Sequence, residues 1–384
     1  MVILFWCAAS FVAYVYAGYP LTLWVWARLR PRALASVGQA PKGVTIVLAI
    51  RNERDRLRAR IDNLLQLDYP SSARQIVVVS DGSDDQPESI VASYDSLVDF
   101  VPVLRGGKAL ALNAGVARAR FDVLVFADAR QQFASDALIE LTQPLQDPAV
   151  GGVTGELLLD CESSWRRTAV RDRRRGPRPA APDRRRTGPS TIAPGVGIYW
   201  RYEKMLRRLE SAVGSTLGAT GAIYALRRDL WSPLPGDTIL DDVLAPMRAV
   251  LAGHRVVFNP RAQAFDRTAP DAETESRRKV RTLAGNYQIL WLEPRLLNPL
   301  RNPVWLQYTS HKLARLLVPY ALLLMFAASV ASAARHPVYL GALIVQCACY
   351  ALAGYGAWLE SRAPSASRQA PPPRVSTGKE AVNA

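Results

Sequence analysis

The chain has 384 residues, of which 49% are hydrophobic and 21% are charged, and its formal net charge is +15. This composition excludes disorder along the whole chain, and only four cysteines, none in a zinc-type cluster with histidine, exclude a disulfide scaffold. Three long segments contain no charged residue: 1–27, 316–334 and 337–359. Because a helix rises about 1.5 Å per residue, each segment can cross a hydrocarbon core of roughly 30 Å. A freely soluble protein is therefore excluded.

The first apolar segment predicts a membrane-spanning helix over 1–27 rather than a cleaved signal peptide, because it lacks a basic start and is too long. Basic residues follow this segment closely and recur in the C-terminal tail, whereas the turn between the last two segments holds a single arginine. By the positive-inside rule, spans at 1–27, 313–334 and 337–359 place the intervening domain in the cytoplasm. We therefore expect a multi-pass protein of the inner (cytoplasmic) membrane, with a disordered cytoplasmic tail over 360–384.

Between the first two spans, residues 44–127 alternate between apolar runs and amphipathic segments. The pattern predicts strands at 44–50, 76–79, 99–104 and 122–127, and helices at 53–67, 86–95 and 108–119. This order implies an α/β fold with a mostly parallel sheet and right-handed crossovers. We expect the domain to cover 42–275, followed by interfacial helices over 276–312, since the aromatic residues Trp291, Trp305 and Tyr308 favour that depth.

An arginine-rich stretch interrupts the domain at 165–189, where ten arginines accompany two aspartates. Prolines and glycines punctuate it and it has no apolar period, so it predicts a disordered insertion. A solvated loop is the simplest interpretation, and a patch for anionic lipid or nucleic acid is the alternative. We expect no nucleic-acid partner.

Polar residues stand just beyond the carboxyl end of each of the four predicted strands, where an open α/β sheet binds its ligands. The stretch around Lys108 is not a P-loop, because Pro102 occupies the first glycine position and Ala109 follows the lysine. No glycine follows the first strand, which excludes a dinucleotide fingerprint, and the kinase loops are absent. A nucleotide site rich in carboxylates, with one Gly-Gly-Lys, remains.

The series AIRNERD (49–55), VSDGSDD (79–85), RGGKALALNAG (105–115) and FADAR (126–130) resembles glycosyltransferase family 2, which has the GT-A fold. Three later stretches extend the resemblance to about residues 44–300: GATGAIYALRRDLW (218–231), ILDDVLAPMR (239–248) and RRKVRTLAGNYQ (277–288). With its flanking spans, the chain looks like the membrane-embedded polysaccharide synthases of this family.

The resemblance implies a donor site at the strand ends. Asp81, with Glu53 beside it, would accept hydrogen bonds from the uracil or ribose of a nucleotide sugar, although such residues are also good turn formers. Lys108 follows two glycines at a helix start, where backbone N–H groups and an ammonium suit a diphosphate. A surface lysine in a turn is the alternative interpretation of Lys108.

The resemblance also implies a metal site with one departure. Asp128 occupies the place of the first carboxylate of the family's DxD motif, but Arg130 stands at the third position and supplies no oxygen ligand for Mg²⁺ or Mn²⁺. Either Asp128 and the diphosphate hold the metal with water, or Arg130 itself neutralises the leaving diphosphate. The expectation is a metal at Asp128.

The acidic pair Asp241 and Asp242 matches the family's catalytic position, where the second member is the general base. Asp242 would take the proton of the acceptor hydroxyl as it attacks the anomeric carbon, which inverts the configuration of the sugar. Acidic residues that stabilise a helix N-terminus through its dipole are the alternative.

Two further elements follow from the resemblance. Arg278 and Arg281 occupy the ends of the family's QxxRW motif, of which neither Gln nor Trp is kept, and Arg281 would clamp the diphosphate. A basic face under anionic headgroups explains these arginines equally well. Gly218 and Gly221 would bring backbone close to the acceptor sugar, because glycine is small.

The sequence therefore predicts an inverting hexosyltransferase that moves a sugar from a nucleotide-diphosphate donor, UDP-linked by resemblance, to a growing glycan or lipid-linked acceptor. The alternative is a catalytically silent nucleotide-sugar-binding subunit that scaffolds a synthase complex. Because three spans are few for a translocation channel, a homodimer or an export subunit is an expected partner besides the lipid bilayer.

Overall fold

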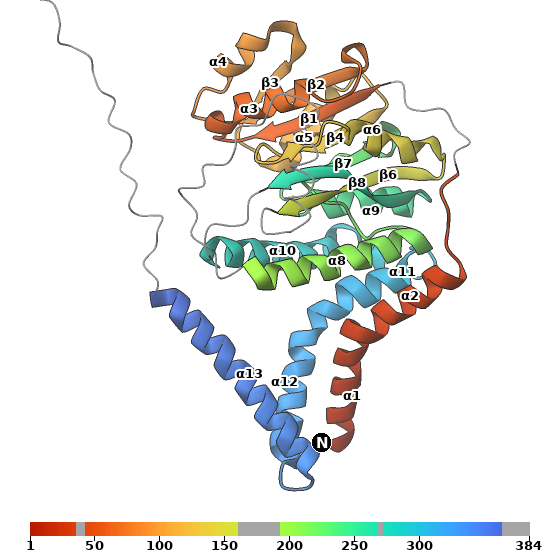
Figure 1. Ribbon diagram of the computed structural model, residues 1–384, viewed down its shortest axis with the longest axis vertical. Helices are drawn as coiled ribbons and strands as arrows, with labels where there is room; N and C mark the ends of the chain where they lie inside the picture. Colours follow the sequence, from red (N-terminus) through yellow and green to blue (C-terminus); the bar gives the residue numbers. More distant parts are fainter. Residues whose placement is uncertain (36–42, 160–192, 267–271, 363–384) are drawn as a thin grey trace, which may run out of the picture. The chain divides into compact units, whose positions relative to one another are not determined.

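The computed structural model describes residues 1–35, 43–159, 193–266 and 272–362. The predicted insertion at 165–189 and nearly all of the predicted tail lie outside the described residues. The chain divides into two compact units, which are Ala9–Ala321 and a smaller unit formed by Met1–Ala8 with Leu322 and the residues after it (Figure 1).

Three helical runs are long and apolar enough to cross a membrane: Val2–Leu29, Trp305–Ser332 and Pro337–Leu359. The first comprises α1 (Val2–Ala13), the π-helix η1 (Tyr14–Gly18) and α2 (Tyr19–Leu29). The second comprises α11 (Trp305–Gln307), the π-helix η7 (Tyr308–Leu313) and α12 (Ala314–Ser332), and the third is α13 (Pro337–Arg362).

The second run begins at Trp305, whereas the sequence pattern predicted interfacial helices up to 312 and a span from 313. The apolar pattern breaks at His311, Lys312 and Arg315, but the backbone stays helical through all three. These charged residues therefore belong to the same continuous helix as the apolar stretch that follows.

The larger unit contains an eight-stranded sheet in the order β3-β2-β1-β4-β7-β6-β8-β5. The strands are β1 (Val44–Ile50), β2 (Arg74–Asp81), β3 (Asp99–Val103), β4 (Val123–Ala127), β5 (Gln132–Phe133), β6 (Val150–Leu159), β7 (Ile223–Arg227) and β8 (Arg255–Asp266). The first four in this order are mutually parallel, β7 is antiparallel to β4 and β6, and β6 is parallel to β8. The prediction of an α/β fold with a mostly parallel sheet is confirmed.

Helices cover both faces of this sheet, as the fully apolar strands require. Along β1, Ile46 and Leu48 pack into one core cluster with α3 (Arg54–Leu65) and α6 (Ala137–Thr142). Val47 packs on the opposite face with α5 (Lys108–Ala117) and α9 (Asp241–Leu251). Each fully buried Ile or Leu contributes roughly 1.5–3 kcal/mol, so the two clusters hold the strand ends in place.

Two long helices lie below the sheet in Figure 1, namely α8 (Ala193–Val213) and α10 (Ala272–Leu292). α8 packs against α2 through an apolar cluster of Tyr19, Leu23, Leu206 and Val213. Short helices complete the unit: α4 (Glu88–Val91), η2 (Ser71–Ala73), η3 (Ala92–Leu97), η4 (Gln143–Gln146), η5 (Arg228–Leu230) and η6 (Pro294–Leu297).

Candidate active site

The sheet topology gathers the candidate residues at one edge. Because β3, β2, β1 and β4 are parallel neighbours, their carboxyl ends lie in a row. β7 runs the other way, and Ile223 at its start pairs with Ala127 at the end of β4. The segment just before β7, which includes Gly218 and Gly221, therefore arrives beside Asp128.

An ion cluster occupies this edge. The Lys108 Nζ atom lies 3.1 Å from Asp128 Oδ1 and 3.3 Å from Asp241 Oδ2. The Asp241 side chain is only 6% exposed, against 30% for Lys108 and Asp128. Burial disfavours the charged ammonium, but Asp241, Asp128 and Asp242 outweigh it and raise the pKa of Lys108. Three sequence motifs, spread over more than a hundred residues of the chain, thus meet at one cation.

The turn that presents Lys108 is held by Asp81. Gly107 has φ +93°, a left-handed conformation that favours glycine. The Asp81 carboxylate accepts the N–H of Gly106 at 2.7 Å and the N–H of Gly107 at 3.0 Å. In this structure Asp81 therefore supports the Gly-Gly-Lys turn, and its contact with a nucleoside stays a prediction.

The backbone of the GATGA segment holds Asp242. The Gly221 N–H donates to Asp242 Oδ2 at 3.0 Å, and the Ala219 N–H donates to the Asp242 carbonyl oxygen at 2.7 Å. A Cβ atom at position 221 would lie 2.8 Å from that carboxylate oxygen, so only glycine allows this approach. Gly218, with φ +130°, likewise lies against Asp242 and Val243. The predicted contact of these glycines with an acceptor stays a prediction, since here they meet the carboxylate.

Asp242 has the electrostatic environment of a general base. Burial and the neighbouring Asp241 carboxylate raise the pKa of Asp242 to about 6, against the opposing charges of Lys108, Lys312 and Arg207. A base with a pKa near the working pH is largely ionised there and still binds a proton well. The position of both aspartates in the first turn of α9 also suits the helix dipole.

Tyr224 is buried close to the carboxylates of the site, and the sequence did not single it out. Its side chain stacks on Phe126 of β4 with ring centroids 4.6 Å apart, and its hydroxyl oxygen has no hydrogen-bond partner among the described residues. Burial and the carboxylates of Asp241, Asp242 and Asp128 raise its pKa well above the usual value. A tyrosine in a strand carries no functional signal in sequence, because aromatic residues are common strand formers.

Hydrogen bonds between backbone N–H groups and side chains join the segments that follow β1 and β2. Asn52 Oδ1 accepts the Asp84 N–H at 2.9 Å, and the Arg54 N–H donates to Asp85 Oδ2 at 2.8 Å. Glu53, between these residues, pairs with Arg56 at 2.5 Å. The structure thus places Glu53 at the predicted edge, next to the segment that follows Asp81.

Helix α10 contains Arg278 and Arg281, and it contacts the loop that directly precedes the acidic pair. Arg281 donates to the Ile239 carbonyl oxygen at 3.4 Å, and Gln288 accepts the Ile239 N–H at 2.9 Å. Arg278 is half-buried and Arg130 is exposed, and within the described part of the chain neither side chain forms a hydrogen bond or ion pair. Among the residues that the structure describes, no hydrogen bond or ion pair joins these three arginines to the Lys108 cluster.

A divalent cation has a partial ligand set here. The carboxylates of Asp128 and Asp241 both contact the Lys108 ammonium, so two acidic side chains already share one cation at this edge. Within the described residues, no group of three or more His, Cys, Asp or Glu side chains is arranged to hold a metal ion. A bound Mg²⁺ or Mn²⁺ would therefore need oxygen atoms from the donor and from water.

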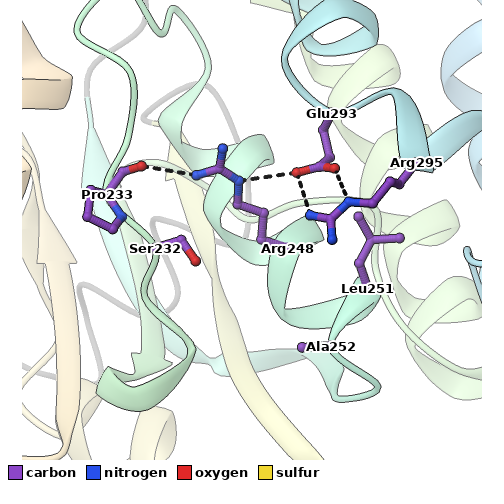
Figure 2. Close-up of a pocket in the computed structure, with 7 residues that line it drawn as sticks. All are labelled: Ser232, Pro233, Arg248, Leu251, Ala252, Glu293 and Arg295. Carbon is purple, nitrogen blue, oxygen red and sulfur yellow. Dashed lines mark hydrogen bonds and ion pairs between the residues drawn. The ribbon is translucent and has the colours of Figure 1, made fainter.

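A separate cavity of about 420 Å³ lies near the other end of α9, lined by Ser232, Pro233, Arg248, Leu251, Ala252, Glu293 and Arg295 (Figure 2). Three of its lining residues, Arg248, Leu251 and Ala252, lie at the end of α9, whereas the acidic pair starts that helix roughly 15 Å away along its axis. The Arg248–Glu293–Arg295 ion pairs cross it, so this cavity is a structural feature distinct from the acidic pair.

The fold is that of the GT-A class. The model of glycosyl transferase family 2 matches residues 45–209, and the relatives and the solved structure to which this chain is similar are glycosyltransferases. The predictions of family, fold and enzyme class are confirmed.

Relatives of known name match about a third of the chain. A poly-beta-1,6-N-acetyl-D-glucosamine synthase of Staphylococcus epidermidis is 29% identical over 139 residues, which are 35% of this chain and 33% of that protein. The protein of the same name from Staphylococcus aureus strain MSSA476 is 32% identical over 127 residues, 32% of this chain and 30% of that protein. The chain thus aligns with about a third of the length of these relatives.

Among solved structures, a mannosyltransferase from Pyrobaculum calidifontis in complex with GDP-Man and Mn²⁺ is similar to nearly the whole chain. The TM-score is 0.64 at 22% identity, and the match covers 92% of this chain and 94% of that one. At this identity the likeness shows a shared fold.

Proposed function

We propose that this chain is an inverting membrane glycosyltransferase that moves a sugar from a nucleotide-diphosphate donor to a hydroxyl group of a growing glycan or a lipid-linked acceptor. The observation that carries this proposal is the convergence of Lys108, Asp128 and Asp241 with Asp242, the half-buried carboxylate that accepts the Gly221 N–H. Residues from four motifs supply, at one edge, a cation for a diphosphate and a base for a hydroxyl.

On the donor side, Lys108 and the N-terminal N–H groups of α5 bind the diphosphate. The ammonium exchanges its two carboxylate contacts for phosphate oxygens, and the helix N-terminus favours the same anion. A divalent cation held by Asp128 would add positive charge against the developing charge on the leaving diphosphate. Glu53 and Asp81, at the ends of β1 and β2, lie where a nucleoside would bind, and Arg130, Arg278 and Arg281 are further candidates for diphosphate contacts.

On the acceptor side, Asp242 accepts the proton of the acceptor hydroxyl. The hydroxyl oxygen then forms a bond to the anomeric carbon, while the bond from that carbon to the diphosphate oxygen breaks and the nucleoside diphosphate leaves with the electron pair. One displacement inverts the anomeric configuration. A positioned base of this kind supplies roughly 10²–10⁴ in rate.

The relatives support a hexosamine polymer as the first product to test. Two of them are named as synthases of poly-beta-1,6-N-acetyl-D-glucosamine. We propose that the apolar helices hold the enzyme in the inner membrane with the catalytic unit in the cytoplasm. A homodimer or an export subunit would complete a path for a long product.

A donor screen tests this function. The full chain in lipid nanodiscs is incubated with radiolabelled UDP-N-acetylglucosamine, UDP-glucose and GDP-mannose, with and without a chelator, and the products are analysed. We expect sustained turnover of one donor, and an Asp242→Asn variant that binds the donor but transfers about 10²–10⁴ times more slowly. The matched control is Asp229→Asn, which changes an exposed aspartate of η5 and leaves the rate unchanged.

Two outcomes would contradict the proposal. Tight donor binding without turnover would favour the scaffold alternative, and a fully active Asp242→Asn variant would remove the base assignment.

A further inference from the structure

A second charged region of the larger unit lies where η7 crosses α8. The His311 ring nitrogens lie 2.6 Å from Glu210 Oε1 and 3.4 Å from Glu203 Oε2. Glu203 and Glu210 are two turns apart on α8, so they share one face, and Arg207 lies between them on that face. Lys312, the residue after His311, lies close enough to Arg207, Glu203 and Glu210 to interact with their charges.

The carboxylates of this region already have partners. Glu203 pairs with Arg315 and with His311. Glu210 accepts the Tyr19 hydroxyl at 2.8 Å and contacts His311. The partners Tyr19, His311 and Arg315 come from three separate elements. Each acid is therefore already paired with groups other than Arg207 and Lys312.

Neither of the two remaining cations forms an ion pair with a carboxylate in the described part of the chain. Over the ranges of the chain that the structure describes, Lys312 forms no hydrogen bond or ion pair, and Arg207 bonds one neutral group, the Thr220 hydroxyl. Lys312 stands in the early turns of an apolar helix, where an unpaired charge is costly and marks a ligand site more often than a structural one. A guanidinium beside an ammonium matches a phosphate, which takes bidentate bonds from arginine.

These cations also lie at the catalytic base. Thr220, the partner of Arg207, directly precedes Gly221, whose N–H binds Asp242. The charges of Lys312 and Arg207 both lower the pKa of Asp242. They belong to α8 and η7, whereas Lys108, on the donor side, comes from α5 and contacts Asp128 and Asp241.

We propose that Arg207 and Lys312 bind a phosphate group of a lipid-linked acceptor, so that the hydroxyl group of its sugar faces Asp242. This assignment rests on the proposed function and narrows its acceptor to an anionic lipid conjugate. The apolar helix that begins at Trp305 gives the lipid chain a path along the same element that carries Lys312.

Binding of a short prenyl phosphate tests the assignment. The full chain in phosphatidylcholine nanodiscs is titrated calorimetrically with farnesyl phosphate, farnesol and inorganic phosphate. We expect farnesyl phosphate to bind at least tenfold more tightly than either other probe. Arg207→Gln and Lys312→Met should each weaken it at least fivefold, and Lys312→Arg should restore most of the affinity.

The control is Arg208→Gln, which removes the neighbouring cation of α8 that lies 3.8 Å from Glu156, and it should leave the affinity unchanged. Donor binding, measured separately, should be unchanged in all variants, so a loss of phosphate binding is distinguished from failure of the donor site or of folding. Equal affinity for farnesol, equal affinity for inorganic phosphate, or an equal loss in Arg208→Gln would overturn the assignment. Displacement by phosphatidylglycerol would assign the site to bilayer headgroups instead.

Discussion

At the scale of single residues, Asp242 is held between opposing influences. Desolvation and the neighbouring Asp241 favour the protonated form of its half-buried carboxylate, yet this carboxylate accepts the Gly221 N–H and faces three cations, which favour the ionised form. The balance leaves its pKa at about 6. A proton acceptor for a sugar hydroxyl needs such a balance, because a fully stabilised carboxylate would be too weak a base.

The rate of transfer should therefore depend on pH through Asp242. Because only the ionised carboxylate can accept a proton, kcat/KM should rise about tenfold per pH unit below a midpoint near pH 6 and level off above about pH 7. In Asp241→Asn the like charge is removed, so the midpoint should move to lower pH. Initial rates across the range check both expectations, and a profile that stays flat around pH 6 would contradict the assignment of Asp242.

The contact of Gly221 with the base predicts a second effect. In Gly221→Ala the new Cβ would lie 2.8 Å from Asp242 Oδ2 and displace the carboxylate, so kcat should fall at least tenfold while donor affinity changes little. Gly214→Ala is the control, since a Cβ there meets no atom within 4 Å. Steady-state kinetics separate the two parameters, and equal rates for both variants would show that the approach of Gly221 is unimportant.

At the scale of elements, α9 links the site to a buried ion pair at its other end. Arg248 lies 3.3 Å from Glu293, a carboxylate that is only 5% exposed and that also binds Arg295 (Figure 2). Burial raises the pKa of Glu293, but Arg295 and Arg248 outweigh it and lower the value. The end of α10 is thereby attached to the end of α9, which steadies the helix that presents the acidic pair.

This arrangement predicts that burial decides how much an ion pair contributes to the free energy of unfolding. Arg248→Met leaves Glu293 with one half-exposed partner and should destabilise the protein by roughly 1–3 kcal/mol. Arg120→Met removes a pair of similar length, 3.4 Å to Asp99, but the Arg120 side chain is 65% exposed, so its effect should stay below about 1 kcal/mol. Thermal unfolding of the full chain in detergent compares the two, and equal shifts in Tm would argue against the role of burial.

At the scale of the whole molecule, three helical runs are long and apolar enough to cross a membrane. The proposed orientation, with the catalytic unit in the cytoplasm, follows from the distribution of basic residues and can be tested. In a variant whose cysteines are replaced by serine, Arg335→Cys should react with an impermeant maleimide on intact cells. Arg301→Cys should react only after lysis, and the reverse pattern would invert the proposed orientation.

Much of the donor side was predictable because its signals are local. The apolar run at 44–50 is β1 to the residue, and the run at 76–79 lies within β2 (Arg74–Asp81). Lys108 begins α5 as the Gly-Gly-Lys pattern indicates. Parallel strands carry their carboxyl ends to one edge, so a period and a turn motif suffice to place Asp81, Lys108 and Asp128 together.

Other contacts could not be predicted, because they join residues with no shared pattern. The role of Gly221 in holding Asp242 depends on β7 running antiparallel to β4, which periodicity does not reveal. In the sequence, Tyr224 is an ordinary strand residue. Only the structure shows that its hydroxyl is buried close to carboxylates. The break in the apolar pattern at His311, Lys312 and Arg315 predicted a second span from 313, whereas the helix already begins at Trp305.

The sequence by itself determined the family, the α/β class and the apolar helices, because composition, hydrophobic period and turn chemistry act over a few neighbouring residues. Only the tertiary structure decided which distant groups meet: Lys108 between Asp128 and Asp241, Gly221 on Asp242, and Arg207 on Thr220. The physical reason is that electrostatic and hydrogen-bond energies depend on distances of a few ångströms in space, which strand order and helix crossing set.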